Sequence, residues 1–357
     1  MPSPHTIRVL VVDDSALIRQ MLTRALAQDP RIEVVGTAKT GTEAIQQAIG
    51  LEPDVITLDI EMPELTGLEA LPYLIKRTEA RVVMLSSLDS TEVTYQALSS
   101  GAVDFMTKPK AGFATSLTEL TDELLKKIRT ASRIDPSKRL CAPDAAGDGQ
   151  CEEEGTGAGE AAREVKLLVG IAASTGGPPA LEHVFAGLSP DLPAAYLIVQ
   201  HLPQGFTASL AKRIDKASPL TVVEAEKGAA LQPGTAYVAP HGKHLFVSRT
   251  AGGDLRVSFD EGPSIHGVKP AADPMFHSVA KLMGSESVGV VLTGMGADGA
   301  AGLSSVKAAG GETIAQDEAT SVVWGMPGAA VRQGAAKHVV PLGGVAAEIR
   351  RAIRARG

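Results

Sequence analysis

The chain has 357 residues, enough for two domains with separate cores, and its 44% hydrophobic and 21% charged residues are typical of a globular protein. A net charge of -7 and an aromatic content of 3% argue against nucleic acid as a partner, because they indicate neither a basic surface nor a stacking platform. No apolar run reaches membrane-spanning length and no secretory signal opens the sequence, so we expect a soluble, cytoplasmic protein without membrane insertion. Two cysteines, Cys141 and Cys151, indicate neither a disulfide framework nor a zinc site.

The first 130 residues alternate between strand and helix signals. Because a helical stretch follows each short apolar run, we expect an α/β fold with a doubly wound parallel sheet, (βα)5 in its order along the chain. The predicted strands are 7–12, 32–36, 54–58, 81–85 and 102–106, and the predicted helices are 15–28, 41–49, 67–76, 90–100 and 117–131.

A change of composition begins near Arg133. The stretch that follows is rich in Gly, Ala, Asp and Glu and has no apolar periodicity, which is typical of a flexible linker. We therefore predict an N-terminal domain over 1–130, an acidic linker over 131–164 and a second domain over 165–357.

The second domain alternates again. We predict a parallel α/β sheet carrying a β-rich insertion at 221–259, in which "AGGD" forms a hairpin turn. The predicted strands of the sheet are 166–172, 195–200, 289–293 and 337–341, and the predicted helices are 178–188, 206–217, 273–283, 299–309 and 344–355.

Acidic side chains gather at one edge of the predicted N-terminal sheet. Asp13 and Asp14 follow its first strand and Asp59 ends its third, and the carboxyl ends of parallel strands meet at the edge where ligands bind. Three carboxylates repel one another unless a divalent cation lies among them, and oxygen ligands suit Mg²⁺. Ser86 ends the fourth strand and Lys108 follows the fifth, and both are candidates for contacting a phosphoryl group. An acidic pair after a strand is more often a turn or a helix cap, and a Lys-Pro pair is commonplace, but the acidic pair, Asp59, Ser86 and Lys108 at one sheet edge together favour a site.

The stretch "IAASTGGPPA" at 171–180 places Ser174 between a strand and a helix. It matches the hydrolase nucleophile elbow G-x-S-x-G only in part, because Ala172 replaces the leading glycine. It also lacks the lysine of a phosphate-binding loop. By its own pattern the stretch is either a nucleophile turn or a plain structural turn.

A serine nucleophile needs a base and an orienting acid. His201 follows the predicted strand 195–200, and Asp298 lies in a glycine-rich loop after the predicted strand 289–293. If these strands are neighbours, their carboxyl ends bring both residues toward Ser174. Asp298 has a structural alternative as the cap of the next helix, and backbone N–H groups around Met295 could stabilise an oxyanion.

Residues 5–130 resemble a response-regulator receiver domain through the motifs "VVDDS", "LDIEMPELTG", "MLSS" and "TKP". The resemblance implies that a histidine kinase is the phosphodonor and that Asp59 accepts the phosphoryl group. It also implies an aromatic switch at Phe105, for which a half-buried strand residue is the alternative. The remaining implied residues are the Mg²⁺ ligands Asp13, Asp14, Asp59 and Glu61 (by its backbone carbonyl) and the phosphoryl-sensing Ser86 and Lys108.

Residues 166–353 resemble the catalytic domain of the chemotaxis protein-glutamate methylesterases, the CheB family. The motifs that carry this resemblance are "ASTGGP", "QHLP", "FTASLA", "LTGMGADG" and "AQDEATSVVWGMP". It implies a triad of Ser174, His201 and Asp298, with Met295 and Thr175 at the oxyanion site and no cofactor in this domain. Small departures from the family pattern are Ala172, Lys269 and Pro274.

The two resemblances together imply a phosphorylation-activated serine hydrolase. Its substrates would be glutamyl methyl esters, and specific glutamines for deamidation, on the cytoplasmic domains of methyl-accepting chemoreceptors. The alternative from another class is a receiver coupled to a non-catalytic binding module.

Overall fold

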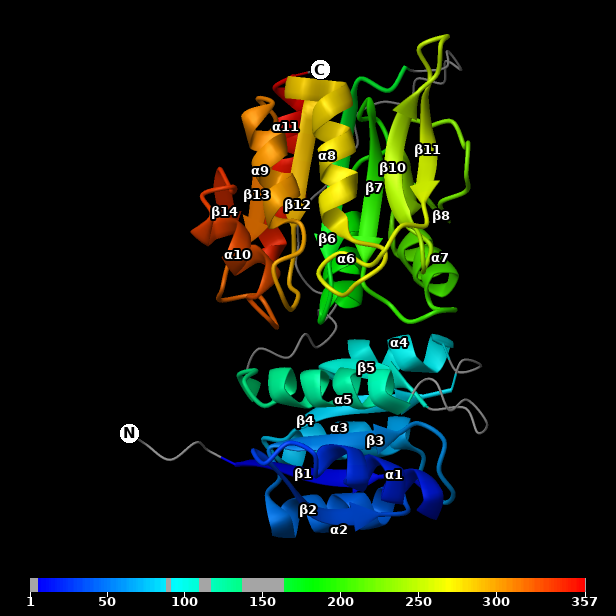
Figure 1. The fold of residues 1–357 in the computed structure, drawn as a ribbon, viewed down its shortest axis with the longest axis vertical. Coiled ribbons are helices and arrows are strands. Elements are labelled where there is room, and N and C mark those ends of the chain that lie inside the picture. Colours follow the sequence, from blue (N-terminus) through cyan, green and yellow to red (C-terminus); the bar gives the residue numbers. More distant parts are fainter. Residues whose placement is uncertain (1–5, 88–90, 109–116, 137–163, 357) are drawn as a thin grey trace.

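The structure is a computed structural model that describes residues 6–87, 91–108, 117–136 and 164–356. Its described residues form two parallel sheets, each with helices on both faces, and a small antiparallel hairpin beside the second sheet. The first parallel sheet lies beneath the second in Figure 1. Most of the predicted linker, 137–163, lies outside the described residues. Among the described helices, none is both long and apolar enough to cross a membrane.

The N-terminal sheet has five parallel strands in the order β2-β1-β3-β4-β5, a doubly wound order that agrees with the prediction. Local signals fix its helix starts: the side chain of Thr66, for example, forms a capping box with Glu69. The elements are β1 (Ile7–Val12), α1 (Ala16–Leu26), β2 (Ile32–Ala38), α2 (Gly41–Leu51), β3 (Val55–Asp59), α3 (Gly67–Arg77), β4 (Arg81–Ser86), α4 (Thr91–Ser99), β5 (Asp104–Thr107) and α5 (Leu117–Ala131).

The C-terminal sheet has seven parallel strands in the order β14-β13-β12-β6-β7-β9-β8. Strands β6 and β7 at its centre are buried along their whole length, as their apolar sequences require. The elements are β6 (Leu167–Ala173), α6 (Gly177–Ala186), β7 (Ala194–Gln200), α7 (Thr207–Ala217), β8 (Thr221–Glu224), β9 (Thr235–Val238), β10 (His244–Arg249), β11 (Leu255–Asp260), α8 (Ala272–Met283), η4 (Gly284–Glu286), β12 (Ser287–Val291), α9 (Ala300–Ala308), β13 (Glu312–Gln316), α10 (Met326–Arg332), β14 (His338–Val340) and α11 (Leu342–Arg354).

The region predicted as a β-rich insertion divides between two sheets. Strands β8 and β9 join the main sheet in parallel, and only β10 and β11 form a separate antiparallel hairpin, with "AGGD" at its turn. Strand β13 and helix α10 were not predicted. The sequence of β13, "ETIAQ", has polar residues at both ends, and the seven residues of α10 are too few to show a helical period.

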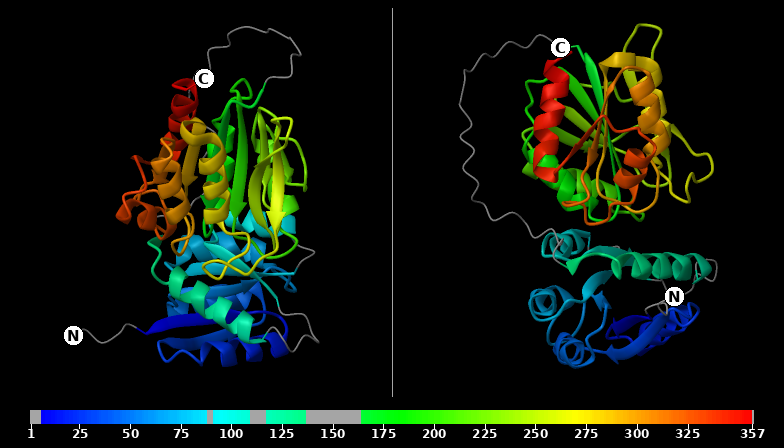
Figure 2. Two further views of the ribbon diagram at one scale, coloured as in Figure 1. Left: turned by 45° about the horizontal axis from the view of Figure 1, so that its top comes forward. Right: turned by 90° about the vertical axis from the view of Figure 1, so that its left-hand side faces the viewer.

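The carboxyl ends of the C-terminal strands face β5, α4 and α5 of the N-terminal domain (Figures 1 and 2). Aromatic rings join the two domains there: Phe105 lies 4.6 Å from Phe206 and Tyr95 lies 6.1 Å from it, between ring centroids. The hydroxyl of Tyr95 donates a hydrogen bond of 2.8 Å to the carbonyl of Phe206. Phe105 is 3% exposed and packs against the second domain. It is therefore more deeply buried than the half-buried strand residue considered from the sequence.

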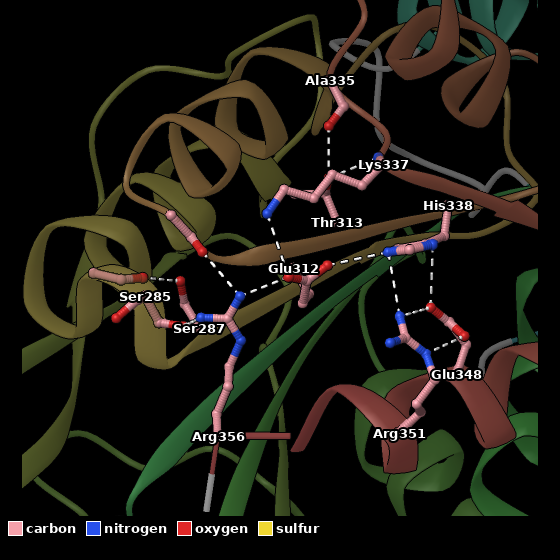
Figure 3. A network of polar contacts seen from close by, with 12 residues as sticks. Ser285, Ser287, Glu312, Thr313, Ala335, Lys337, His338, Glu348, Arg351 and Arg356 are labelled. Carbon is pink, nitrogen blue, oxygen red and sulfur yellow. Dashed lines mark hydrogen bonds and ion pairs between the residues drawn. The ribbon is translucent and has the colours of Figure 1, made fainter. Parts of the chain in front are cut away.

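The amino ends of the C-terminal strands carry a network of ion pairs (Figure 3). Glu312, the first residue of β13, is bound by Arg356 at 2.6 Å, by His338 at 3.1 Å and by Lys337 at 3.3 Å. His338 also contacts Glu348 of α11 at 3.3 Å. Burial alone would raise the pKa of Glu312, but these partners outweigh it and hold the pKa at about 2. The network ties the edge strand β14 and the last helix to the sheet.

Candidate active site

Three strand ends bring the predicted catalytic side chains together. Strand β6 lies between β7 and β12, so the residues that follow these strands share one edge of the sheet. The backbone N–H of His201 donates to the carbonyl of Ala173 at 3.2 Å. On the other side, the N–H of Ser174 donates to the carbonyl of Thr293 at 3.0 Å. Strands β6, β7 and β12 are therefore neighbours in the sheet, as the sequence analysis required.

His201 and Asp298 form a pair in which Nε2 of the ring lies 2.8 Å from Oδ2 of the carboxylate. Asp298 is 2% exposed and also accepts the backbone N–H groups of Ala272 at 2.7 Å and Asp273 at 3.2 Å. Burial would raise the pKa of Asp298, but the hydrogen bonds and charge of His201 and these two N–H groups lower it below its usual value. Asp298 therefore remains a carboxylate beside the imidazole.

The structural alternative for Asp298 is not observed. Helix α9 begins after Gly299, which caps it without a side-chain hydrogen bond. The carboxylate of Asp298 lies instead at the N-terminus of α8, a helix that comes earlier in the chain. The dipole of that helix also favours negative charge there.

The imidazole is oriented opposite to that of the chymotrypsin triad, in which Nδ1 contacts the acid. Because Nε2–H of His201 donates to Asp298, the nitrogen that can take a serine proton is Nδ1. Within the described residues, Oγ of Ser174 makes no hydrogen bond to this ring; such bonds commonly form only when substrate is bound.

The turn after Ser174 requires glycine. Gly176 has φ +76, a left-handed conformation, and caps α6, whose first N–H, that of Gly177, donates to the carbonyl of Ser174 at 2.8 Å. The loop at Met295 is fixed by backbone hydrogen bonds: Gly294 donates to Val323 at 2.9 Å and accepts from Met326 at 2.8 Å. Both candidate oxyanion segments, at Thr175 and Met295, thus have a defined backbone beside Ser174.

A cavity of about 550 Å³ lies over the predicted catalytic side chains, and both domains line it. Thr175, next to Ser174, donates a hydrogen bond of 2.6 Å from its hydroxyl to Asp104 of β5. Lys127 of α5 contacts the same carboxylate at 2.8 Å, and the hydroxyl of Thr130 contacts the sulfur of Met295. The N-terminal domain therefore forms part of the wall of the cavity beside Ser174.

The second predicted site lies at the carboxyl edge of the N-terminal sheet. Carboxylate oxygens of Asp13, Asp14 and Asp59 lie within 4.8 Å of one another. Nζ of Lys108 lies 2.6 Å from Asp59 and 3.0 Å from Asp13. Burial raises the pKa of Asp59 to about 6 and the charge of Asp13 adds to this, although Lys108 opposes both. Three carboxylates lie close together, Asp13 and Asp59 are both buried, and such an oxygen donor set fits Mg²⁺.

The other residues predicted for this site surround Asp59. The backbone N–H of Glu61 donates to Oδ1 of Asp59 at 3.2 Å. The buried hydroxyl of Ser86 lies 2.5 Å from the hydroxyl of Thr94 in α4. Ser86 thus connects the end of β4 to the helix that contacts the second domain through Tyr95.

Sequence reasoning missed several residues around the two sites. Asp104 and Thr175 meet only because two domains dock, and no local pattern shows this. Gln200 precedes His201 directly, and its polar character at the end of an apolar strand was the available signal. Of the departures, Ala172 is buried in β6, Pro274 lies in the first turn of α8, where a missing N–H costs no helical bond, and Lys269 lines the cavity.

Comparison with known proteins matches both parts of the chain to families. Residues 9–116 match the response regulator receiver domain, and residues 169–349 match CheB methylesterase. A protein-glutamate methylesterase/protein-glutamine glutaminase of Pyrococcus horikoshii is 44% identical over 94% of this chain and 90% of its own length. One of the same description from Thermotoga maritima is 42% identical over 94% and 96%.

A solved structure gives the same result for the second domain. The crystal structure of the Thermotoga maritima CheB methylesterase catalytic domain is 39% identical, with a TM-score of 0.51, and covers 53% of this chain and 98% of that one. These comparisons support the hydrolase and not the alternative of a non-catalytic module. The chain belongs to the CheB family of receiver-linked methylesterases.

Proposed function

We propose that Ser174, His201 and Asp298 carry out the methylesterase reaction of this family in this chain. The observation that carries the proposal is the His201–Asp298 pair of 2.8 Å at the strand end next to Ser174. Asp298 holds Nε2 of the imidazole, so Nδ1 is free to act as a general base. The substrate is a glutamyl methyl ester on the cytoplasmic domain of a chemoreceptor.

The reaction follows from these positions. Oγ of Ser174 attacks the side-chain carbonyl of the glutamyl ester while Nδ1 of His201 takes the serine proton. Backbone N–H groups at Thr175 and Met295, with the N-terminus of α6, stabilise the oxyanion. The imidazolium then protonates the departing methoxide. Water hydrolyses the acyl-enzyme to glutamate, and the same steps on a glutamine release ammonia.

Serine-directed labelling tests this assignment. A phosphonate should label the wild-type chain at Ser174, and Ser174→Ala should lose both labelling and ester hydrolysis. Ser304→Ala is a matched control, because Ser304 only bonds a carbonyl within α9. Undiminished ester hydrolysis in Ser174→Ala would remove the proposed nucleophile.

We further propose that phosphorylation of Asp59 by a histidine kinase controls access to the cavity. Asp13, Asp14, Asp59 and the backbone carbonyl of Glu61 would hold Mg²⁺, which supplies positive charge to balance the phosphoryl group. Lys108 and Ser86 would contact that group. When the hydroxyl of Ser86 turns toward the phosphoryl group, its hydrogen bond with Thr94 is lost. Thr94 is next to Tyr95, which binds the second domain, so this loss favours separation of the two domains.

A further inference from the structure

Gln200, the last residue of β7, contacts the backbone of two proposed catalytic residues. Its side-chain nitrogen Nε2 donates to the carbonyl of Ser174 at 2.8 Å and to the carbonyl of His201 at 3.1 Å. The residue is 1% exposed, so water does not compete for these bonds. One amide group thus joins the nucleophile turn to the residue that carries the general base.

The orientation of this amide is determined by its neighbours. Both groups near Nε2 are carbonyls, which only a donor satisfies, so a flipped amide would place an oxygen against two oxygens. Oε1 is buried without a hydrogen-bond partner among the described residues and faces Gly177. A Cβ at Gly177 would lie 1.9 Å from Oε1, so glycine is required there for the amide to fit.

The backbone pairing of β6 with β7 ends just before Ser174 and His201, so it does not hold these two residues to each other. The pairing of β6 with β7 ends at Ala173 and Gln200, and the last backbone bond runs from the N–H of His201 to Ala173. Ser174 then turns toward α6, with its carbonyl accepting from Gly177 at 2.8 Å. The amide of Gln200 continues the connection beyond the last backbone bond of the sheet.

We infer that Gln200 is a positioning residue of the hydrolase, which sets the separation between Ser174 and His201 by holding both carbonyls with one donor group. The inference rests on the proposed roles of those two residues. A misplacement of about 1 Å between reacting groups can lower a rate by about a hundredfold. Loss of the donor should therefore reduce kcat while leaving substrate binding in the cavity unchanged.

Two substitutions at Gln200 test this role in the full-length chain activated with acetyl phosphate and Mg²⁺. The substrate is a synthetic peptide with a glutamyl γ-methyl ester. Gln200→Met keeps the length and removes the donor, and kcat should fall about 10- to 100-fold with KM within about twofold of the wild-type value. Gln200→Glu keeps the shape but brings a carboxylate against two carbonyls, so its kcat should be lowest at about pH 8.

Acidification gives the discriminating readout. Burial beside two carbonyls raises the pKa of the introduced acid, and its protonated form can donate one hydrogen bond. The activity of Gln200→Glu relative to wild type should therefore rise severalfold from about pH 8 to about pH 6. The matched control is Tyr196→Phe, which removes a buried hydroxyl that has no hydrogen-bond partner in the described part of the chain. It lies on the same strand, and the variant should keep wild-type kcat.

The inference is overturned if kcat of both variants stays within about twofold of wild type. It is also overturned if the relative activity of Gln200→Glu does not change with pH while its Tm falls, since that is a loss of stability alone. If Gln200→Met does not fold, the pH profile of Gln200→Glu decides. A wild-type chain without turnover would instead overturn the proposed function.

Discussion

Two buried carboxylates, Asp59 in the first domain and Asp298 in the second, differ in their surroundings. Each lies at the carboxyl edge of a parallel sheet and is almost fully buried, at 1% and 2% exposure. Asp298 receives three N–H donors and its pKa is lowered. Asp59 lies beside Asp13 and its pKa is raised to about 6 in spite of Lys108. Carboxylates buried at the carboxyl edges of two parallel sheets thus have pKa values shifted in opposite directions by their different neighbours.

The difference follows the task proposed for each group. A carboxylate that orients an imidazole needs its charge fixed and fully hydrogen-bonded before substrate arrives. A carboxylate that accepts a phosphoryl group needs oxygens available to a cation and to phosphorus, and its crowding is relieved by Mg²⁺. Buried hydrogen-bond donors around a carboxylate therefore distinguish one that stays charged, such as Asp298, from one that is proposed to react, such as Asp59.

The largest expected effect is at Asp298. Asp298→Asn keeps a side chain of the same shape but removes the charge and favours the wrong tautomer of His201, so kcat should fall about 10⁴-fold. Initial rates of ester hydrolysis measure it. A variant with near-wild-type kcat would show that the fixed charge of this carboxylate is unnecessary, and the comparison with Asp59 would fail.

Asp59→Asn should abolish activation while preserving the basal rate. The amide cannot be phosphorylated, so acetyl phosphate and Mg²⁺ should leave its turnover flat while they raise that of the wild type. The exposed Glu79 provides the control Glu79→Gln, which should be activated normally. A rise in Asp59→Asn would assign the switch to another group.

A smaller effect is expected where the receiver contacts the serine turn. Asp104→Ala removes the acceptor of Thr175, an interdomain hydrogen bond worth about 1 kcal/mol in docking the domains, and also the partner of Lys127 within the receiver. Basal turnover without phosphodonor should rise about fivefold. Glu33→Gln, on an exposed position of β2, should leave it unchanged. An unaltered basal rate in Asp104→Ala would mean that this contact does not restrict the cavity.

The smallest effect concerns a carboxylate with a lowered pKa and no proposed catalytic role. Glu312 contributes stability above the pKa of an unfolded glutamate, and this is lost as pH falls from about 4.5 through its folded value of about 2. Glu312→Gln should lower Tm by a few degrees at pH 7 and by much less near pH 2, with kcat unchanged. Equal Tm losses at both pH values would contradict the assigned ion pairs, and a change in kcat would link this end of the sheet to the site.

Most strands and helices were predicted, because they follow periodic patterns in the sequence. Contacts that form only when the two domains dock were missed. The parallel-strand rule brought Ser174, His201 and Asp298 to one edge before any contact was known, because each follows a clear apolar run. It missed β13, whose ends are polar, and could not foresee that β8 and β9 extend the main sheet. The contact of Asp104 with Thr175 and the double hydrogen bond of Gln200 depend on side-chain positions that no periodicity encodes.

The covalent connection between the two domains bears on how strongly they must interact. Helix α5 ends at Ala131 and β6 begins at Leu167, so the receiver and the hydrolase are joined by a stretch short enough to keep the receiver at an effective concentration on the order of millimolar over the cavity. At that concentration, a weak interface suffices to keep most molecules closed, and a change of about 1.4 kcal/mol shifts the open fraction about tenfold. The control proposed for the receiver acts within one chain and therefore does not depend on how much of the protein the cell contains.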